Sequence, residues 1–157
     1  MLVFLVLYMV DVTGFFACLA ALSRKGRAME TIDDMAGLVK ERTGIALAMT
    51  AFSLSALGLP IFSGFWAKYF VFKAALNAGL WGPAVIGLVG SVVAAFYYLK
   101  LIKVIWFDAS PGTTDKPPME ANAIAVAAGL FAFPLVIGAL IWIYPQAGKA
   151  AAAFGLA

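Results

Sequence analysis

Long apolar segments alternate with short polar ones along this sequence. Four apolar segments, at about residues 1–22, 45–77, 81–107 and 121–144, have the length that a helix needs to cross a hydrocarbon core of about 30 Å. The chain is 64% hydrophobic and 12% charged, whereas a soluble domain has about 25% charged residues. A water-soluble fold would expose too much apolar surface. We therefore predict an all-α fold, a polytopic transmembrane helix bundle with four crossings.

The polar segments at 23–44 and 108–120 predict the orientation of the bundle. Basic residues gather in the first segment and continue into the second, whereas the turn at 77–82 has none. Loops rich in lysine and arginine stay in the cytoplasm, so we place both segments there and the tail at 145–157 on the outer side. Four aromatic residues are expected at the two membrane interfaces: Trp81, Trp142 and Tyr144 outside, and Trp106 inside.

The segment 23–44 also carries a local helix signal. Thr31 stands three residues before Asp34, as in a capping box. Apolar residues follow at helical spacing, which predicts a short amphipathic helix from about Ile32 to Glu41. Such a helix would lie along the membrane surface.

The apolar segment 45–77 is too long for one straight crossing. Its 33 residues would span about 50 Å as a helix. Gly58, Pro60 and Gly64 interrupt it, because proline lacks a backbone donor and glycine tolerates irregular backbone. We predict a discontinuous transmembrane helix, with half-helices at about 45–58 and 64–77 and the break at about 58–64.

Lys68 lies four residues past Gly64, close to mid-membrane depth. A lysine there costs about 2.5–3.5 kcal/mol on insertion scales, and a charge beside a discontinuous helix is typical of transporter ion sites. Irregular backbone at that depth must face protein or a hydrated cavity. We predict that Lys68 relays protons; the alternative is a lysine that snorkels or fills a structural cavity. Ser53 and Ser55 face the same region and could hydrogen-bond water or freed carbonyl groups.

Three further charged residues are candidates for the same proton relay. Asp11 lies in the middle of the first apolar segment and either pairs with a lysine such as Lys68 or is protonated and hydrogen-bonded locally. Lys73 either snorkels to the outer face or extends the path. Lys100, near the inner end of 81–107, either anchors the interface or joins the path.

Other classes of site find little support in the composition. The chain has no histidine and one cysteine, Cys18, which argues against an ordinary transition-metal site. Acidic residues are mixed among the basic ones of segment 23–44, which argues against nucleic-acid binding. We expect no catalytic residue, metal or bound cofactor on this chain.

Three motifs resemble a known family. They are the stretch 56–68 (ALGLPIFSGFWAK), the stretch 34–38 (DMAGL) and the stretch 96–100 (FYYLK). Together they resemble the antiporter-like membrane subunit N of proton-translocating NADH-quinone oxidoreductase, respiratory complex I. The first motif alone is less specific, because related antiporter subunits share it.

The resemblance implies a role within a larger assembly. The four crossings would be the last ones of that subunit, with 45–77 as its second discontinuous helix and Lys68 as its central relay lysine. Redox chemistry would occur in other subunits, which hold NADH, FMN, iron–sulfur clusters and quinone. The chain alone would be part of a translocase, and Asp11 departs from the family pattern, which has an uncharged residue there.

The same resemblance predicts the surroundings of the chain. We expect it in a bacterial inner membrane, in contact with lipid, with neighbouring antiporter-like and other membrane subunits, and with the upstream part of its own subunit. The apolar start at Met1 suggests that the sequence begins partway through a longer protein. Two alternatives remain: a subunit of a multisubunit cation/proton antiporter, or a non-catalytic structural fragment of a helix bundle.

Overall fold

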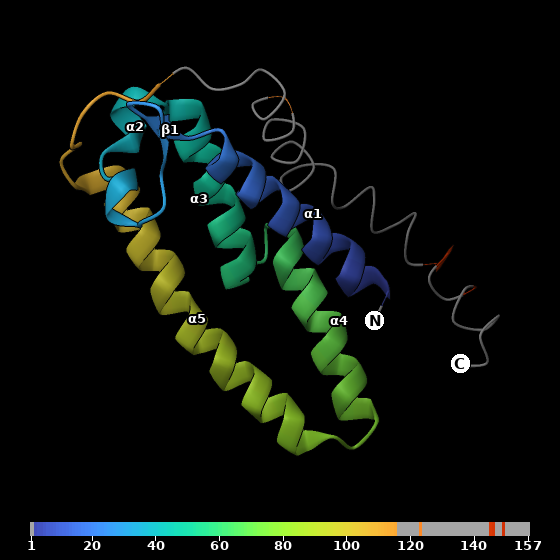
Figure 1. Ribbon diagram of the computed structural model, residues 1–157. Helices are drawn as coiled ribbons and strands as arrows, with labels where there is room; N and C mark the ends of the chain where they lie inside the picture. The colour runs from blue at the N-terminus through green and yellow to red at the C-terminus, as the bar shows by residue number, and fades with distance from the viewer. Residues whose placement is uncertain (1, 116–122, 124–144, 147–148, 150–157) are drawn as a thin grey trace.

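The computed structural model describes residues 2–115, 123, 145–146 and 149. The predicted crossing at 121–144 therefore lies outside the described residues, as does most of the tail at 145–157. Figure 1 shows the order of the elements along the chain. They are α1 (Leu2–Ala20), β1 (Ser23–Arg24), β2 (Arg27–Ala28), the 3-10 helix η1 (Asp33–Met35), α2 (Leu38–Glu41), α3 (Thr43–Leu57), α4 (Ser63–Asn77) and α5 (Trp81–Phe107).

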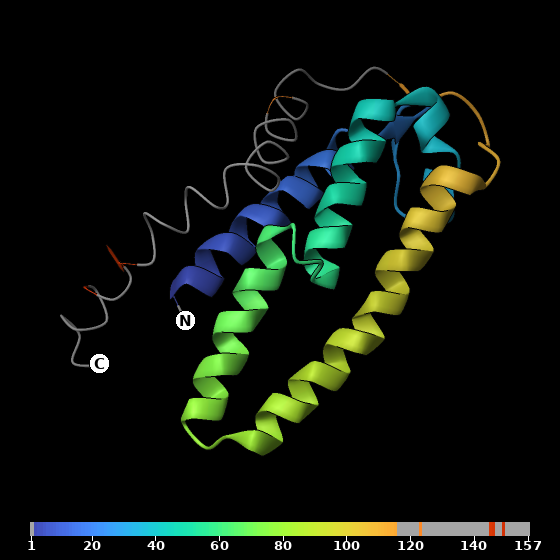
Figure 2. The ribbon, with the colours of Figure 1, turned by 180° about the vertical axis from the view of Figure 1, so that it is seen from behind.

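Four long helices form the body of the described part. α1 packs against both α3 and α4, and α5 packs mainly against α3. Figures 1 and 2 show α3 and α4 following one another beside α5, with their facing ends in the middle of the bundle. The end of one helix and the start of the next therefore lie between α1 and α5.

The apolar core lies at the end of the bundle that the polar segment covers. Its residues come from the end of α1, from the segment that follows it, from α3 and from the end of α5, and burial of such side chains is the main favourable contribution to folding. The members of this cluster are Cys18, Ala21, Leu22, Met29, Met35, Leu38, Ile45, Ala46, Met49, Phe52, Leu101 and Ile105.

The rest of α5 exposes large apolar side chains. Ile86, Val92 and Phe96 are 67–73% exposed. Within the described part of the chain, α5 is the helix whose length and composition would allow it to cross a membrane. Its bounds, Trp81–Phe107, coincide with the predicted segment 81–107. An apolar surface of this kind requires lipid or further protein against it.

The helical hydrogen-bond ladder stops at Leu57 and restarts at Ser63. Gly58 adopts a left-handed conformation with a φ of 101°, and the N–H groups of Gly58 and Leu59 both donate to the Leu54 carbonyl, at 3.1 and 3.2 Å. This is a common way for a glycine to end a helix. The residues that follow form a turn, in which the Phe62 N–H donates to the Leu59 carbonyl at 3.0 Å.

The start of α4 packs directly on the last turns of α3. A Cβ atom added to Gly64 would lie 1.9 Å from the Ser55 carbonyl oxygen and 2.5 Å from its carbonyl carbon. No side chain fits at that separation, so the two backbones touch because residue 64 is glycine. This contact sets the relative position of the two helix ends.

The polar segment after α1 is less helical than predicted. β1 and β2 pair antiparallel, with Ser23 opposite Ala28, and Lys25 and Gly26 form the turn with φ values of 52° and 74°, as two-residue hairpins require. The reciprocal hydrogen bonds between Thr31 and Asp34 are present: the Thr31 N–H donates to Asp34 Oδ2 at 2.9 Å, and the Asp34 N–H donates to Thr31 Oγ1 at 3.3 Å.

The expected continuous helix from Ile32 to Glu41 is replaced by two short pieces, η1 and α2. Gly37 separates them with a φ of 65°, and its N–H donates to the Val104 carbonyl of α5 at 3.1 Å. A Cβ at Gly37 would lie 2.7 Å from the Ser110 backbone nitrogen. Close packing against the end of α5 therefore outweighs the local preference for a continuous helix.

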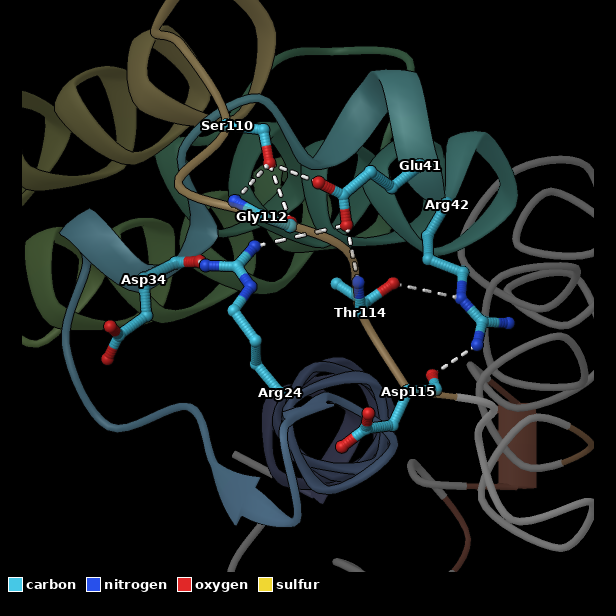
Figure 3. Close-up of polar contacts among 8 residues, drawn as sticks. All are labelled: Arg24, Asp34, Glu41, Arg42, Ser110, Gly112, Thr114 and Asp115. Atoms are coloured by element: carbon cyan, nitrogen blue, oxygen red, sulfur yellow. Dashed lines mark hydrogen bonds and ion pairs between the residues drawn. The ribbon is translucent and has the colours of Figure 1, made fainter.

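A polar network joins this segment to residues 108–115 (Figure 3). The Glu41 carboxylate accepts hydrogen bonds from the Ser110 hydroxyl and from the Thr114 N–H at 2.7 Å. The Arg42 guanidinium donates to Thr114 Oγ1 at 3.3 Å and to the Asp115 carbonyl. Two segments about 70 residues apart in sequence are thereby held at the same end of the bundle.

Two carboxyl groups in this region have lowered pKa values. The pKa of Asp34 lies below its ordinary 3.8, because the Thr31 side chain and then the Thr31 backbone donate hydrogen bonds that favour the ionised form. The pKa of Asp115 is lowered chiefly by the Gly26 N–H, which donates to Oδ2 at 2.8 Å. Both carboxylates therefore stabilise the fold above pH 3.8, and this contribution is lost as the pH falls through their lowered pKa values.

We predict that Gly64→Ala destabilises the protein by about 1–3 kcal/mol or more, because the added methyl group overlaps the Ser55 backbone. The measurement is the thermal unfolding midpoint of the detergent-solubilised protein. Gly90→Ala in α5 is the matched control, since nothing lies within 4 Å of its added Cβ. Equal midpoints for the two variants would show that α3 and α4 do not make this contact.

We also predict that the Gly26 and Thr31 amides lose hydrogen-exchange protection as the pH falls through the lowered pKa values of Asp115 and Asp34, when these carboxylate acceptors become protonated. Asp115→Ala should remove protection of Gly26 at every pH and leave Thr31 as in the unmodified protein. Protection factors from hydrogen-exchange mass spectrometry, corrected for intrinsic exchange, provide the test. Persistent protection of Gly26 in Asp115→Ala would contradict the assignment.

Candidate functional site

Lys68 extends from the second turn of α4 back to the end of α3. Its Nζ donates to the Ala56 carbonyl at 2.7 Å and lies 3.4 Å from the Leu57 carbonyl. Carbonyls in the last turn of a helix lack partners within the helix, and they carry the partial negative charge of the helix dipole. The half-buried ammonium group therefore caps α3.

The open backbone at Gly58 makes this contact possible. A Cβ there would lie 3.6 Å from Lys68 Cδ and 3.8 Å from Nζ, so the lysine side chain passes along the face of the glycine. The sequence placed a lysine beside the break, and the structure shows that the two features are in direct contact.

Asp11 reaches the same break from α1. It is 6% exposed, and its carboxylate accepts hydrogen bonds from the Ser55 hydroxyl at 2.6 Å and from the Ser63 hydroxyl at 3.0 Å. Ser55 belongs to the last turn of α3, and Ser63 is the first residue of α4. The Gly64 N–H donates to Ser55 Oγ at 2.9 Å. One carboxylate thus joins three helices.

Each helix end at the break holds the side-chain charge that its dipole favours. The ammonium group of Lys68 lies at the C-terminus of α3, and the carboxylate of Asp11 lies at the N-terminus of α4. These are the positions where a cation and an anion, respectively, are stabilised by the helix dipole. The interruption therefore binds two opposite charges at once.

A cavity of about 590 Å³ is lined by both Asp11 and Lys68. Its walls are largely aromatic and aliphatic: Phe4, Tyr8, Phe15, Phe52, Phe72 and Tyr98 are among the lining residues. The volume is sufficient for several water molecules, each of which needs polar partners. The two charged side chains are such partners, so a water connection between them is sterically possible.

A second cavity, also of about 590 Å³, has Lys68 in its lining as well. It is lined by Lys68, Lys73 and Asn77 among others, and Phe72 and Ser91 line both cavities. Lys73 is exposed and its Nζ lies 5.8 Å from the centre of the Tyr69 ring, within range of a cation–π interaction. Lys68 is therefore placed between a space that reaches Asp11 and a space that reaches Lys73.

Lys100 lies apart from this group. It is exposed on α5 and does not line either of these two cavities. One turn later, Lys103 forms an exposed ion pair with Asp108 at 3.3 Å. Of the four predicted relay residues, the structure brings Asp11 and Lys68 to the break. Lys73 shares a cavity lining with Lys68, and Lys100 lies apart.

Two serines complete the site in a way that sequence reasoning missed. Ser55 was expected to meet water or freed carbonyls and instead donates to Asp11; Ser63 was considered only as part of the break. The sequence did contain a signal for this contact: a serine stands on each side of the interruption, and Asp11, in a neighbouring apolar segment, is a carboxylate that needs hydrogen-bond donors. Within the described residues, no group of three acidic, cysteine or histidine side chains could hold a metal ion.

Comparison with known proteins places the chain in a family. The profile described as "NADH:quinone oxidoreductase/Mrp antiporter, TM" matches residues 1–94. NADH-quinone oxidoreductase subunit N from Caulobacter sp. (strain K31) is 69% identical over 99% of this chain and 33% of the relative. The protein of the same name from Granulibacter bethesdensis is 40% identical over 97% of this chain and 31% of the relative.

A solved structure gives the same result. A chain in respiratory complex I from Thermus thermophilus with bound aureothin has 34% sequence identity and a TM-score of 0.74, covering 88% of this chain and 32% of that one. This chain thus spans about a third of the length of these relatives. From these matches and its mostly helical structure, the chain belongs to the membrane family of NADH:quinone oxidoreductase and Mrp antiporter subunits.

Proposed function

We propose that this chain is the C-terminal portion of the antiporter-like subunit N of a proton-translocating NADH-quinone oxidoreductase, and that Lys68 binds and releases the transported proton. The high identity to proteins named subunit N supports the first part. The position of Lys68, on the carbonyls that end α3 and between two cavities, supports the second.

The environment of Lys68 suits reversible protonation. Backbone carbonyls accept hydrogen bonds from an ammonium group and also, more weakly, from a neutral amine, which keeps two N–H donors. When the ammonium group releases a proton to water in either cavity, the amine can retain its contact with the Ala56 carbonyl. A partly buried lysine readily changes its protonation state in this way.

The remaining predictions follow from this assignment. α3 and α4 would be the halves of a discontinuous transmembrane helix among four crossings, with 23–44 and 108–120 on the cytoplasmic side of a bacterial inner membrane. Asp11 would join the relay, Lys73 would extend the path outward and Lys100 inward. NADH, FMN, iron–sulfur clusters and quinone would be bound by other subunits, and adjoining membrane subunits would cover the apolar face of α5.

The family description also includes antiporter subunits. An antiporter that works without NADH would exchange cations through the same lysine. The relatives at 69% and 40% identity carry the NADH-quinone oxidoreductase name, which favours the redox-linked function.

We predict that Lys68→Ala in the assembled complex lowers the number of protons moved per NADH several-fold, because the variant lacks the amine that binds the transported proton at the break. NADH oxidation and proton uptake are measured together in inside-out membrane vesicles. Lys103→Ala is the control and should leave both unchanged, since exposed ion pairs contribute little. Coupled pumping by Lys68→Ala equal to that of the unmodified complex would refute the relay. Loss of sodium–proton exchange with intact NADH-linked pumping would instead support the antiporter.

A further inference from the structure

The buried carboxylate of Asp11 accepts hydrogen bonds from two other helices, which is more than simple packing of α1 requires. A carboxylate at 6% exposure is unfavourable unless hydrogen-bond donors surround it. The Ser55 and Ser63 hydroxyls supply them, and the positive N-terminal end of α4, where Ser63 lies, adds a favourable dipole. The neighbouring Lys68 has its own separate partners, the carbonyls of α3.

The Ser55 hydroxyl is oriented by its other contact. Its oxygen accepts the Gly64 N–H at 2.9 Å, so its hydrogen is available to Asp11 Oδ2 at 2.6 Å. Asp11 accepts from Ser63 Oγ as well, at 3.0 Å. The arrangement therefore holds donors ready for the ionised carboxylate, as sites that stabilise a fixed charge do.

The same atoms can also accommodate a protonated Asp11. Ser55 Oγ and Ser63 Oγ lie 3.0 Å apart, and either can donate to the other. If Asp11 gains a proton, its O–H can donate to Ser63 Oγ while the Ser63 hydrogen rotates towards Ser55 Oγ. Every polar atom keeps a partner in both states, because a hydroxyl both donates and accepts.

We propose that Asp11, together with Ser55 and Ser63, forms a second proton-binding site that exchanges a proton with Lys68 through the cavity they share. This inference rests on the proposed function of Lys68. The proton leaves the Nζ ammonium group, passes through water in the cavity and binds an Asp11 oxygen. An ammonium–carboxylate pair becomes an amine and a carboxylic acid, so the net charge of the break stays constant.

Neutralising both groups together avoids leaving one buried charge without its counterpart. A single buried charge is costly in a low-dielectric interior, and the two helix ends favour opposite charges. Transfer between the two sites thus converts a charged pair into a neutral pair in one step. A neutral Lys68 could next take up a proton through the second cavity, which reaches Lys73.

The test uses Asp11→Asn and Asp11→Glu in the assembled complex. The asparagine oxygen still accepts hydrogen bonds from the serines and so preserves the junction of three helices, but the amide cannot bind a proton. We expect Asp11→Asn to lower the number of protons moved per NADH several-fold, and Asp11→Glu to restore most of the loss.

Ser63→Ala should shift the pH profile of pumping, because it removes the hydroxyl that reorients. Ser53→Ala is the matched control, since Ser53 is equally buried in α3 and donates to the Met49 carbonyl.

A spectroscopic readout covers the case in which Asp11→Asn fails to assemble. Infrared difference spectra of the unmodified complex, recorded across pH, should contain a protonated-carboxyl C=O band that Ser63→Ala shifts in frequency. Normal pumping by Asp11→Asn, or a carboxyl band that Ser63→Ala leaves unchanged, would overturn the second site. If Lys68→Ala abolishes pumping in the same experiments, the failure belongs to Asp11 alone. If Lys68→Ala also pumps normally, the proposed function itself is wrong.

Discussion

The interruption of the backbone hydrogen-bond ladder between Leu57 and Ser63 determines the arrangement of the rest of the site. A helix that stops inside an apolar bundle leaves carbonyls at one end and N–H groups at the other, and these need partners where water is scarce. Lys68 donates to the Ala56 carbonyl, and the Gly64 N–H donates to Ser55 Oγ, whose hydroxyl donates in turn to Asp11. Lys68 and Asp11 supply partners for the backbone groups and hydroxyls at the break. The dipoles of the two helix ends in turn stabilise these charges, a cation at the end of α3 and an anion at the start of α4.

Most of this region could be predicted from sequence because its signals are local. Gly58 ends α3 in the left-handed conformation that glycine adopts readily. The predicted half-helices differ from α3 and α4 by at most two residues at any end, a usual uncertainty in helix boundaries. Lys68 was singled out because a lysine at membrane depth needs an explanation of its own.

The alternatives left open for Asp11 depended on which side chains surround it. In the described structure, Asp11 accepts hydrogen bonds from Ser55 and Ser63. Lys68 does not bond to it directly but lines the same cavity. No sequence spacing connects residues 44 and 52 positions apart on different helices. The same limit applied to Gly37, whose contact with α5 divides the helix expected at 32–41, and to the β1–β2 ribbon.

Sequence alone determined the long helices of the described residues, where the long apolar segment breaks and which charges lie inside it, because chain geometry, hydrophobicity and the conformational limits of proline and glycine act within a few residues. Tertiary structure decided the partners. Gly64 meets the Ser55 backbone, Asp11 binds two hydroxyls, and Lys68 caps α3 rather than α4. These choices depend on how helices pack in three dimensions, and a hydrogen bond across that packing forms only when the whole bundle brings its two atoms within reach.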